Sequence, residues 1–479
     1  MTELTIPIEV SGKEHIYEQI YQYIKKEIIE GSLSEGDRLP STRALAEHLE
    51  VARSTVGLAY DQLLSEGYIE SVPYKGYYVC RLEGMLYLEK PETRPEEKKQ
   101  SDQTARYDFS PNAVDVSGFP MSVWQKINKE VLLDHHNEIF ELGNPKGDLS
   151  LRRTICQYLH SFRGVKCREE QIIVGAGNDY LLMLLGVILG EGRTLAIENP
   201  TYLRAYRIFS SIGYEICTIP LDENGMQVRA LRESGANTAY IMPSHQFPTG
   251  VVMPIGRRLE LLNWANEEEG RFLIEDDYDS EFRYRGKPIP SLQSVDKRGK
   301  VIYIGTFSKS IAPAIRVSYM VLPQELLQCY EKKCSFFSST VSRIQQNVLA
   351  EFIRGGHYER YLNKMRKFYK NKHNQLCKLL EPLEERFEIH GEGAGLHVLL
   401  VSKDPVVTEE ELVEKAQREG CKVYGLSSYL IERGEKDWRA TVLIGYAGLT
   451  ERAIEEGVSA LKRAWLPDGN ISKKGADQK

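Results

Sequence analysis

The chain has 479 residues and a net charge of −6. Its length exceeds that of one typical domain, and a hydrophobic fraction of 42% with a charged fraction of 27% excludes a disordered chain. Taken alone, the acidic charge argues against a nucleic-acid-binding protein, because such proteins usually carry a basic excess.

The sequence also lacks the features of membrane, secreted and zinc proteins. The longest apolar run covers residues 181–190, whereas a membrane span needs about 20 residues. The N-terminus has no basic segment followed by an apolar one, so we expect no secretory signal. The eight cysteines form no C-x-x-C pair and no Cys/His spacing typical of zinc. We therefore expect reduced thiols, no metal, no membrane and a cytoplasmic protein.

Residues 1–80 show the element order of a winged helix-turn-helix. Isoleucines recur every fourth residue from Ile16 to Ile28, which predicts an amphipathic helix that ends near Gly31. A second helix is expected after Pro40, with Ser41 as its N-cap, and a third is expected to end at Gly67. The segment 68–79 then reads as two strands around a turn at residues 73–76.

A charged segment, residues 81–107, is predicted to be a linker because it has two prolines and a long stretch without apolar residues. Behind it, residues 108–479 alternate short apolar runs with helical stretches. This pattern predicts an α/β unit with a mostly parallel sheet that is covered on both faces. Strands are expected near residues 172–174, 194–197, 239–242, 272–274, 301–304 and 317–321. From about residue 380 to 479 we expect a small α+β subdomain.

A lysine and a carboxylate follow two of these strands. Lys309 lies in the loop after residues 301–304, and Asp276 follows residues 272–274. A lysine in such a loop can form a Schiff base with an aldehyde, and a buried carboxylate needs a cationic partner such as a pyridinium nitrogen. Each residue alone is more often structural. Together they indicate a site for an aromatic aldehyde that contains a pyridine ring.

Other residues suit a phosphate group on the same ligand. Gly177 and Asn178 lie between a strand and an apolar helix, where backbone N–H groups at a helix N-terminus can receive phosphate. Hydroxyls and a fixed cation would add further donors, and a tyrosine ring could stack on the ligand. These residues are Thr306, Ser308, Arg316 and Tyr202.

The residues 243–250, 274–282 and 305–310 resemble the fold-type I aminotransferases that use pyridoxal 5'-phosphate (PLP). With the N-terminal unit, nearly the whole chain resembles the MocR/GabR subfamily of GntR-type transcription regulators. The resemblance implies that Lys309 forms the internal aldimine with PLP and that Asp276 pairs with the pyridine nitrogen. It also implies a hydrogen bond from Tyr278 to the phenolic oxygen of PLP and effector contacts from Arg204 and His245.

Two positions depart from the family pattern. Catalytic aminotransferases usually have Asn before Pro-Thr-Gly, but this chain has Phe247, which weakens the case for efficient turnover. Members that respond to GABA have an arginine where this chain has Gly448. The loss of a bidentate arginine contact should cost roughly 1.5 to 3 kcal/mol of affinity. We therefore expect GABA to bind poorly, and we expect Gly448 to leave room for a larger ligand.

Residues 40–56 resemble the GntR-type helix-turn-helix. The N-terminal residues of the second helix of such a motif contact base edges in the major groove, which selects Arg53, Ser54 and Thr55. Other contacts, to the DNA backbone or the minor groove, are expected from Arg43, Lys75 and Gly76. Residues 1–80 hold 7 Lys and Arg against 13 Asp and Glu. DNA binding therefore requires the basic side chains to share one surface.

These observations predict a transcription regulator that binds double-stranded operator DNA and senses an amino-compound effector, or PLP itself, at Lys309. The family resemblance further implies a head-to-tail, domain-swapped homodimer. One alternative is a catalytically active PLP-dependent aminotransferase that carries a DNA-binding domain. Another is a DNA-binding protein that uses its aminotransferase-like unit only as a dimerisation scaffold. Residual or half-transamination is compatible with the regulator.

Overall fold

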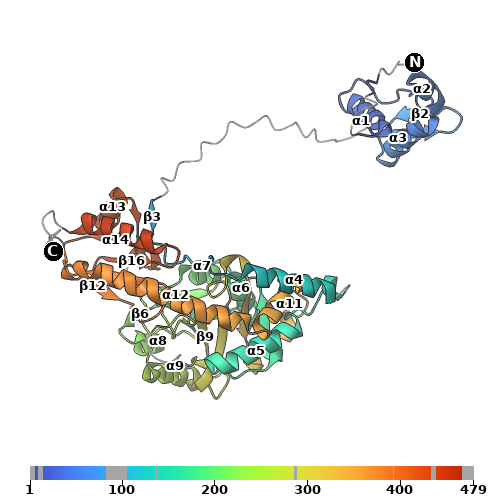
Figure 1. Ribbon diagram of the computed structural model, residues 1–479. Coiled ribbons are helices and arrows are strands. Elements are labelled where there is room, and N and C mark those ends of the chain that lie inside the picture. The colour runs from blue at the N-terminus through green and yellow to red at the C-terminus, as the bar shows by residue number, and fades with distance from the viewer. Residues whose placement is uncertain are drawn as a thin grey trace. The chain divides into compact units, whose positions relative to one another are not determined.

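The computed structural model describes residues 6–8, 14–81, 105–134, 138–284, 289–391, 393–432 and 438–466. The chain divides into two compact units, residues 1–102 and 103–479 (Figure 1). Most of the predicted linker, residues 82–104, lies outside the described residues. No helix in the described part of the chain has the length and apolar character needed to cross a membrane.

The first unit contains three helices and a hairpin in the predicted order. The helices are α1 (Ile16–Ile29), α2 (Thr42–His48) and α3 (Arg53–Ser65), and β1 (Ile69–Val72) pairs antiparallel with β2 (Gly76–Val79). The predicted cap is present, since the Ser41 hydroxyl accepts a hydrogen bond from the backbone N–H of Ala44 at 3.1 Å. Ile20 and Ile24 of α1 pack with Tyr60 of α3 in a fully buried core. These contacts hold α3 and the hairpin together in one small body. The hairpin is called the wing below.

The second unit is built on a mixed sheet of eight strands. Its spatial order is β4 (Ile172–Gly175), β11 (Ser318–Val321), β10 (Val301–Thr306), β9 (Phe272–Asp277), β8 (Thr238–Ile241), β5 (Thr194–Asn199), β6 (Glu215–Asp222) and β7 (Gly225–Met226). The five strands from β10 to β6 are parallel, whereas β11 and β7 run antiparallel to their neighbours. The predicted mostly parallel sheet is therefore confirmed.

Helices cover both faces of this sheet, as the prediction required. Ile274 packs in a cluster with α6 (Asn178–Leu189) and α7 (Leu203–Ser211), whereas its neighbour Leu273 packs in a cluster with α8 (Val228–Glu233) and α9 (Ile255–Glu267). Successive residues of a strand point to opposite faces, which explains the continuous apolar runs. The helices of this unit before the C-terminal piece are α4 (Met121–Asp134), α5 (Leu149–Arg163), α6 (Asn178–Leu189), α7 (Leu203–Ser211), α8 (Val228–Glu233), α9 (Ile255–Glu267), α10 (Gln324–Lys333), α11 (Arg343–Arg354) and α12 (His357–Leu380).

Residues beyond α12 form a smaller α+β piece. Its sheet has the antiparallel order β12 (Phe387–His390), β13 (His397–Ser402), β16 (Thr441–Gly445) and β15 (Tyr424–Gly425), packed with α13 (Glu409–Arg418) and α14 (Glu451–Trp465). A separate parallel pair joins β14 (Cys421–Lys422) to β3 (Tyr107–Asp108). Tyr107, which the sequence prediction assigned to the linker, is thus buried within this piece.

Candidate functional site

A pocket lies at the carboxyl end of the parallel strands, where Asp276 is next to last in β9 and Thr306 ends β10. In open α/β sheets this edge is the usual place for ligands. The pocket is lined by Asn112, Asn178, Asp179, Tyr202, Met242, Phe247, Asp276, Tyr278, Thr306, Ser308, Lys309 and Arg316. All predicted cofactor residues except Gly177 are among them, and Gly177 adjoins Arg316.

Asp276 is a buried carboxylate on one wall of the pocket. Burial is the main cause that raises its pKa to about 7, although a hydrogen bond from the Tyr240 hydroxyl acts in the opposite direction. The neighbouring carboxylates Asp277 and Asp279 raise the pKa further. A cationic ring nitrogen beside Asp276 would compensate this cost and return the group to its charged form.

Lys309 supplies the amine of the same pocket, and its side chain is half-buried. Its Nζ donates a hydrogen bond to the carbonyl oxygen of Pro111 at 3.2 Å. Burial lowers the pKa of Lys309 to about 8, and the negative charge of Asp279 opposes this shift. A larger share of the amine is therefore neutral near pH 7 than in an exposed lysine, and the neutral amine is the nucleophile.

The N-terminus of α6 and Arg316 form a cradle of suitable shape for phosphate. Gly177, the N-cap of α6, has a φ of 92°. A Cβ at this position would lie 2.3 Å from Nη2 of Arg316, so only glycine lets the guanidinium approach the helix end. Two buried polar atoms, Oδ1 of Asn178 and Oγ of Ser308, have no hydrogen-bond partner among the described residues. The donor set, the Lys309 amine and the buried Asp276 carboxylate together fit PLP.

Asp179 is a residue of this site that the sequence analysis missed. Its Oδ2 lies 3.1 Å from Nη1 of Arg204 and 3.1 Å from Nη2 of Arg316. The predicted effector residue Arg204 does not line the pocket, and its side chain is 57% exposed. Asp179 nevertheless connects Arg204 to the phosphate cradle. The only feature of the sequence that could have indicated Asp179 is its position directly after Gly177 and Asn178.

Phe247 forms an apolar wall of the pocket. Its ring contacts the rings of Tyr202, Tyr278, His397 and Tyr429 edge-on, with centroids 5.1 to 6.5 Å apart. Burial, the largest cause, lowers the pKa of His397 to about 4, so this histidine is neutral. The position of a catalytic asparagine is thus occupied by a packed aromatic side chain.

His245, the other predicted effector residue, lies behind the pocket wall. Its Nδ1 is 2.9 Å from the hydroxyl oxygen of Tyr278 and 2.9 Å from Oδ2 of Asp279. The side chain is buried and does not line the pocket. His245 therefore supports Tyr278 rather than facing the pocket directly.

The room expected beside Gly448 is limited by Ala113. Gly448 is exposed, but a Cβ at this position would lie 2.7 Å from the Cβ of Ala113. Gly448 does not line the Lys309 pocket, so the glycine does not enlarge that pocket. The missing arginine remains a departure from the family pattern.

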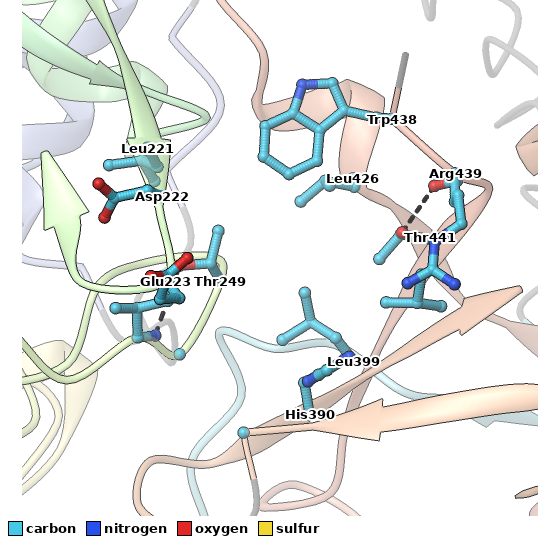
Figure 2. A pocket seen from close by; sticks show the side chains of 14 residues that line it. Leu221, Asp222, Glu223, Thr249, His390, Leu399, Leu426, Trp438, Arg439 and Thr441 are labelled. Carbon is cyan, nitrogen blue, oxygen red and sulfur yellow. Dashed lines mark hydrogen bonds between the residues drawn. The ribbon is translucent and has the colours of Figure 1, made fainter. Parts of the chain in front are cut away.

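A second cavity opens between the large sheet and the C-terminal piece (Figure 2). Asp222 and Glu223 lie on one side of it, and Trp438 and Arg439 lie on the other. None of the predicted site residues lines this cavity, which shares no lining residue with the Lys309 pocket. The predicted cofactor residues therefore lie at one pocket, with only Gly177 beside it rather than in its lining.

In the first unit, the predicted DNA contacts lie on the helix-turn-helix and its wing. Arg53 begins α3 and is exposed with Ser54, while Thr55 is half-buried. Nε of Arg53 donates a weak hydrogen bond to Thr42 Oγ1 at 3.4 Å. The Arg53 side chain therefore lies at the start of α2, where Arg43 follows Thr42.

The wing carries a second group of basic residues. Lys75 is exposed at the turn, and the Arg38 side chain lies against Gly76, 3.5 Å from where a Cβ would stand. Tyr60 of α3 packs edge-on against Tyr77 of the wing, with centroids 4.9 Å apart. The sequence analysis missed Tyr74, which is fully exposed at the tip of the wing.

A winged helix-turn-helix unit joined to an aminotransferase-type α/β unit defines a class of DNA-binding regulators with an aminotransferase-like domain. The family "Bacterial regulatory proteins, gntR family" matches residues 16–79, and "Aminotransferase class I and II" matches residues 108–461. The chain belongs to both families and, within them, to the MocR-type transcriptional regulators. GntR-type regulators bind operator DNA, and the aminotransferase family is PLP-dependent.

Curated relatives share this arrangement over nearly their whole length. The HTH-type transcriptional regulator YdeL of Bacillus subtilis is 40% identical and covers 94% of this chain and 96% of its own. The probable rhizopine catabolism regulatory protein MocR of Rhizobium meliloti is 31% identical and covers 94% of each chain. Among solved structures, the kynurenine aminotransferase of Pyrococcus horikoshii is 27% identical with a TM-score of 0.67, over 76% of this chain and 91% of its own.

Proposed function

We propose that this protein is a PLP-dependent transcription regulator of the cytoplasm. Its N-terminal unit binds specific operator DNA, and its second unit holds PLP at Lys309 and senses an amino compound. The observation that carries this proposal is the pocket in which Lys309, Asp276 and Arg316 converge beside two buried polar atoms that have no hydrogen-bond partner in the described part of the chain. Because the chain also has a gntR-type unit, such a pocket suits the sensing of an amino compound.

Different side chains of the pocket would hold different parts of the cofactor. PLP, when bound, supplies an aldehyde that reacts with primary amines and a pyridine ring that stabilises charge. Lys309 supplies the amine, and Asp276 supplies a negative charge for the ring nitrogen. The α6 N-terminus, Arg316 and the hydroxyls of Thr306 and Ser308 bind the phosphate. Tyr202 would lie against the ring, and Tyr278, which His245 supports, would donate to the phenolic oxygen.

An effector amine would compete with the Lys309 amine, and Arg204 would bind an acidic group of the effector. Phe247 favours sensing over turnover, because its apolar ring offers no hydrogen bond to the cofactor's phenolic oxygen. PLP itself is the second candidate signal. Another relative, 31% identical, is the HTH-type pyridoxine biosynthesis transcriptional regulator PdxR of Corynebacterium glutamicum.

A head-to-tail homodimer is part of the proposal. Large apolar side chains are exposed near the start of the second unit and between α10 and α11, and such side chains favour a protein interface. They include Leu133, Phe140, Leu142 and Phe336. Two DNA-binding units in one dimer would contact repeated half-sites.

The proposal is tested on the full-length protein with PLP. Wild type should show visible cofactor absorbance, which Lys309→Ala should abolish, and Asp276→Asn should weaken PLP binding. Amine substrates should change this absorbance without sustained turnover. Turnover at 1 to 1,000 per second, typical of enzymes, would instead establish the aminotransferase that the fold also permits. If wild type showed no cofactor absorbance, the aminotransferase-like unit would be only a dimerisation scaffold.

A further inference from the structure

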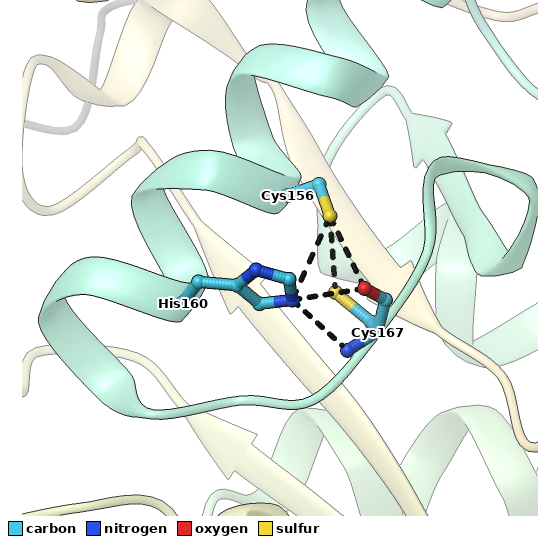
Figure 3. Close-up of side chains that lie close together, drawn as sticks. All are labelled: Cys156, His160 and Cys167. Atoms are coloured by element: carbon cyan, nitrogen blue, oxygen red, sulfur yellow. Dashed lines mark hydrogen bonds between the residues drawn. The ribbon is translucent and has the colours of Figure 1, made fainter.

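Two cysteines and a histidine meet at the end of α5, away from the Lys309 pocket. Cys156 and His160 are four residues apart and therefore lie on the same face of the helix. Gly164, the C-cap, has a φ of 68° and turns the chain so that Cys167 returns to that face. Figure 3 shows the three side chains facing one another, and their ligand atoms all lie within 4.8 Å.

Two of the three distances between the ligand atoms are close to those of a tetrahedral metal site. The two Sγ atoms are 3.8 Å apart, and Cys156 Sγ is 3.8 Å from His160 Nε2. Zinc bonds of about 2.3 Å to sulfur and about 2.0 Å to nitrogen, at tetrahedral angles, give a sulfur–sulfur separation of about 3.8 Å and a sulfur–nitrogen separation of about 3.5 Å. A metal ion could therefore enter with small side-chain movements.

The site is open on one side. Both cysteines are buried, His160 is exposed, and a surface cavity is lined by His160, Cys167 and the loop between them. Water can reach a fourth coordination position from this cavity.

We propose that Cys156, His160 and Cys167 bind one Zn²⁺ ion, with water as the fourth ligand. Thiolate and imidazole ligands suit zinc, and binding releases the two S–H protons to solvent. His160 Nε2, which now lies 2.9 Å from the Cys167 carbonyl oxygen, turns to the metal. The sequence analysis expected no metal, because the spacing C-x₃-H-x₆-C is not one of the usual zinc patterns.

Cobalt(II) is a suitable probe for this site, since it replaces zinc and absorbs visible light. Full-length protein, reduced and treated with a chelator, should bind one Co²⁺ per chain and show thiolate-to-cobalt charge-transfer absorbance. Zn²⁺ should displace it. Zinc should also protect two thiols per chain from alkylation, and peptide mapping should identify them as Cys156 and Cys167.

Matched variants decide whether these residues are the ligands. His160→Gln and Cys167→Ser should each weaken Zn²⁺ binding by at least about tenfold, since even losing a group that only supports a ligand costs 10-fold to 100-fold. Cys217→Ser, a half-buried thiol on β6, should bind as wild type does. His160 is exposed, so its variant should fold, which circular dichroism checks.

Three outcomes would overturn the proposal. One is the absence of a stoichiometric cobalt spectrum. Another is equal zinc affinity in wild type and His160→Gln. The third is a disulfide between Cys156 and Cys167 that forms on mild oxidation of a protein that binds no zinc, which would make the pair a redox site.

Discussion

Arg163 and Asp277 form a buried ion pair that ties the end of α5 to the end of β9. Nε of Arg163 lies 2.7 Å from Oδ2 of Asp277, and both side chains are at most 5% exposed. The guanidinium also donates to Ser244 Oγ and to the carbonyl oxygen of Ile289, at 2.8 and 2.7 Å. Because Asp277 follows Asp276, this pair fixes the strand end on which the cofactor carboxylate stands.

We expect Arg163→Met to destabilise the second unit strongly. Removing one partner of a buried ion pair leaves an uncompensated charge and typically costs about 3 to 5 kcal/mol. The four tryptophans all lie in the second unit, so their fluorescence during urea unfolding reports on this unit alone. Arg229→Met, which removes an exposed pair with Glu233 on α8, should change little. Equal midpoints for both variants would contradict the role of the buried pair.

Capture of PLP by Lys309 should have its own pH dependence. Burial lowers the pKa of Lys309 to about 8 from a usual 10.5. Only the neutral amine attacks the aldehyde, so below this pKa the reactive fraction rises roughly tenfold per pH unit. The rate of cofactor capture by the apoprotein should therefore rise up to about pH 8 and then level off.

The measurement is the growth of visible absorbance after PLP is mixed with apoprotein. N-acetyl-lysine amide is the control, because PLP's own titrations affect both reactions equally. Its rate should continue to rise until above pH 10. If the protein and the control show the same pH profile, Lys309 is not a desolvated amine.

The sequence predicted the sheet and the pocket because both depend on local signals. Strands such as β9, buried on both faces, appear as continuous apolar runs. Residues at the ends of parallel strands must converge, which is why Asp276 and Lys309 could be placed together. β6 was not predicted, since most of its residues are half-buried or exposed and polar residues interrupt its apolar ones.

Contacts between residues that are far apart in the sequence could not be predicted from local sequence patterns. Tyr240 meets Asp276 only because β8 pairs with β9 in one particular register. Cys167 reaches Cys156 only because Gly164 turns the chain back at the end of α5. Neither the register nor the turn direction follows from residue spacing, so these partners had to come from the structure.

Arg53 and Lys75 should contribute differently to DNA binding. Arg53 begins α3, the proposed recognition helix, so Arg53→Ala should lose roughly 1 to 3 kcal/mol at a specific operator and relax base preference. Lys75→Ala in the wing should weaken binding to all sequences and reduce the salt slope by about 1.

Fluorescence anisotropy with operator and scrambled DNA, at several salt concentrations, separates the two effects. Lys26→Ala is the control, since Lys26 is an exposed cation on α1 and pairs with Glu30. It should bind operator as wild type does. If Arg53→Ala lost equal affinity for operator and scrambled DNA, α3 would not be the element that reads bases.

Position 448 offers a test of why the chain lacks a second carboxylate-binding arginine. The Cβ of any residue here would lie 2.7 Å from the Cβ of Ala113. Gly448→Arg alone should therefore be destabilised and should not gain affinity for GABA. The residue that must yield is Ala113, so Ala113→Gly should relieve the contact.

We expect the double variant Gly448→Arg, Ala113→Gly to recover stability and to bind GABA more tightly than wild type, because a charge-assisted contact to a carboxylate contributes about 1.5 to 3 kcal/mol. Isothermal titration of the PLP-loaded protein measures the affinity, and thermal unfolding measures the recovery. Ala113→Gly alone is the control and should leave GABA binding weak. If Gly448→Arg alone were as stable as wild type, the close approach of Ala113 would not be what excludes a side chain at this position.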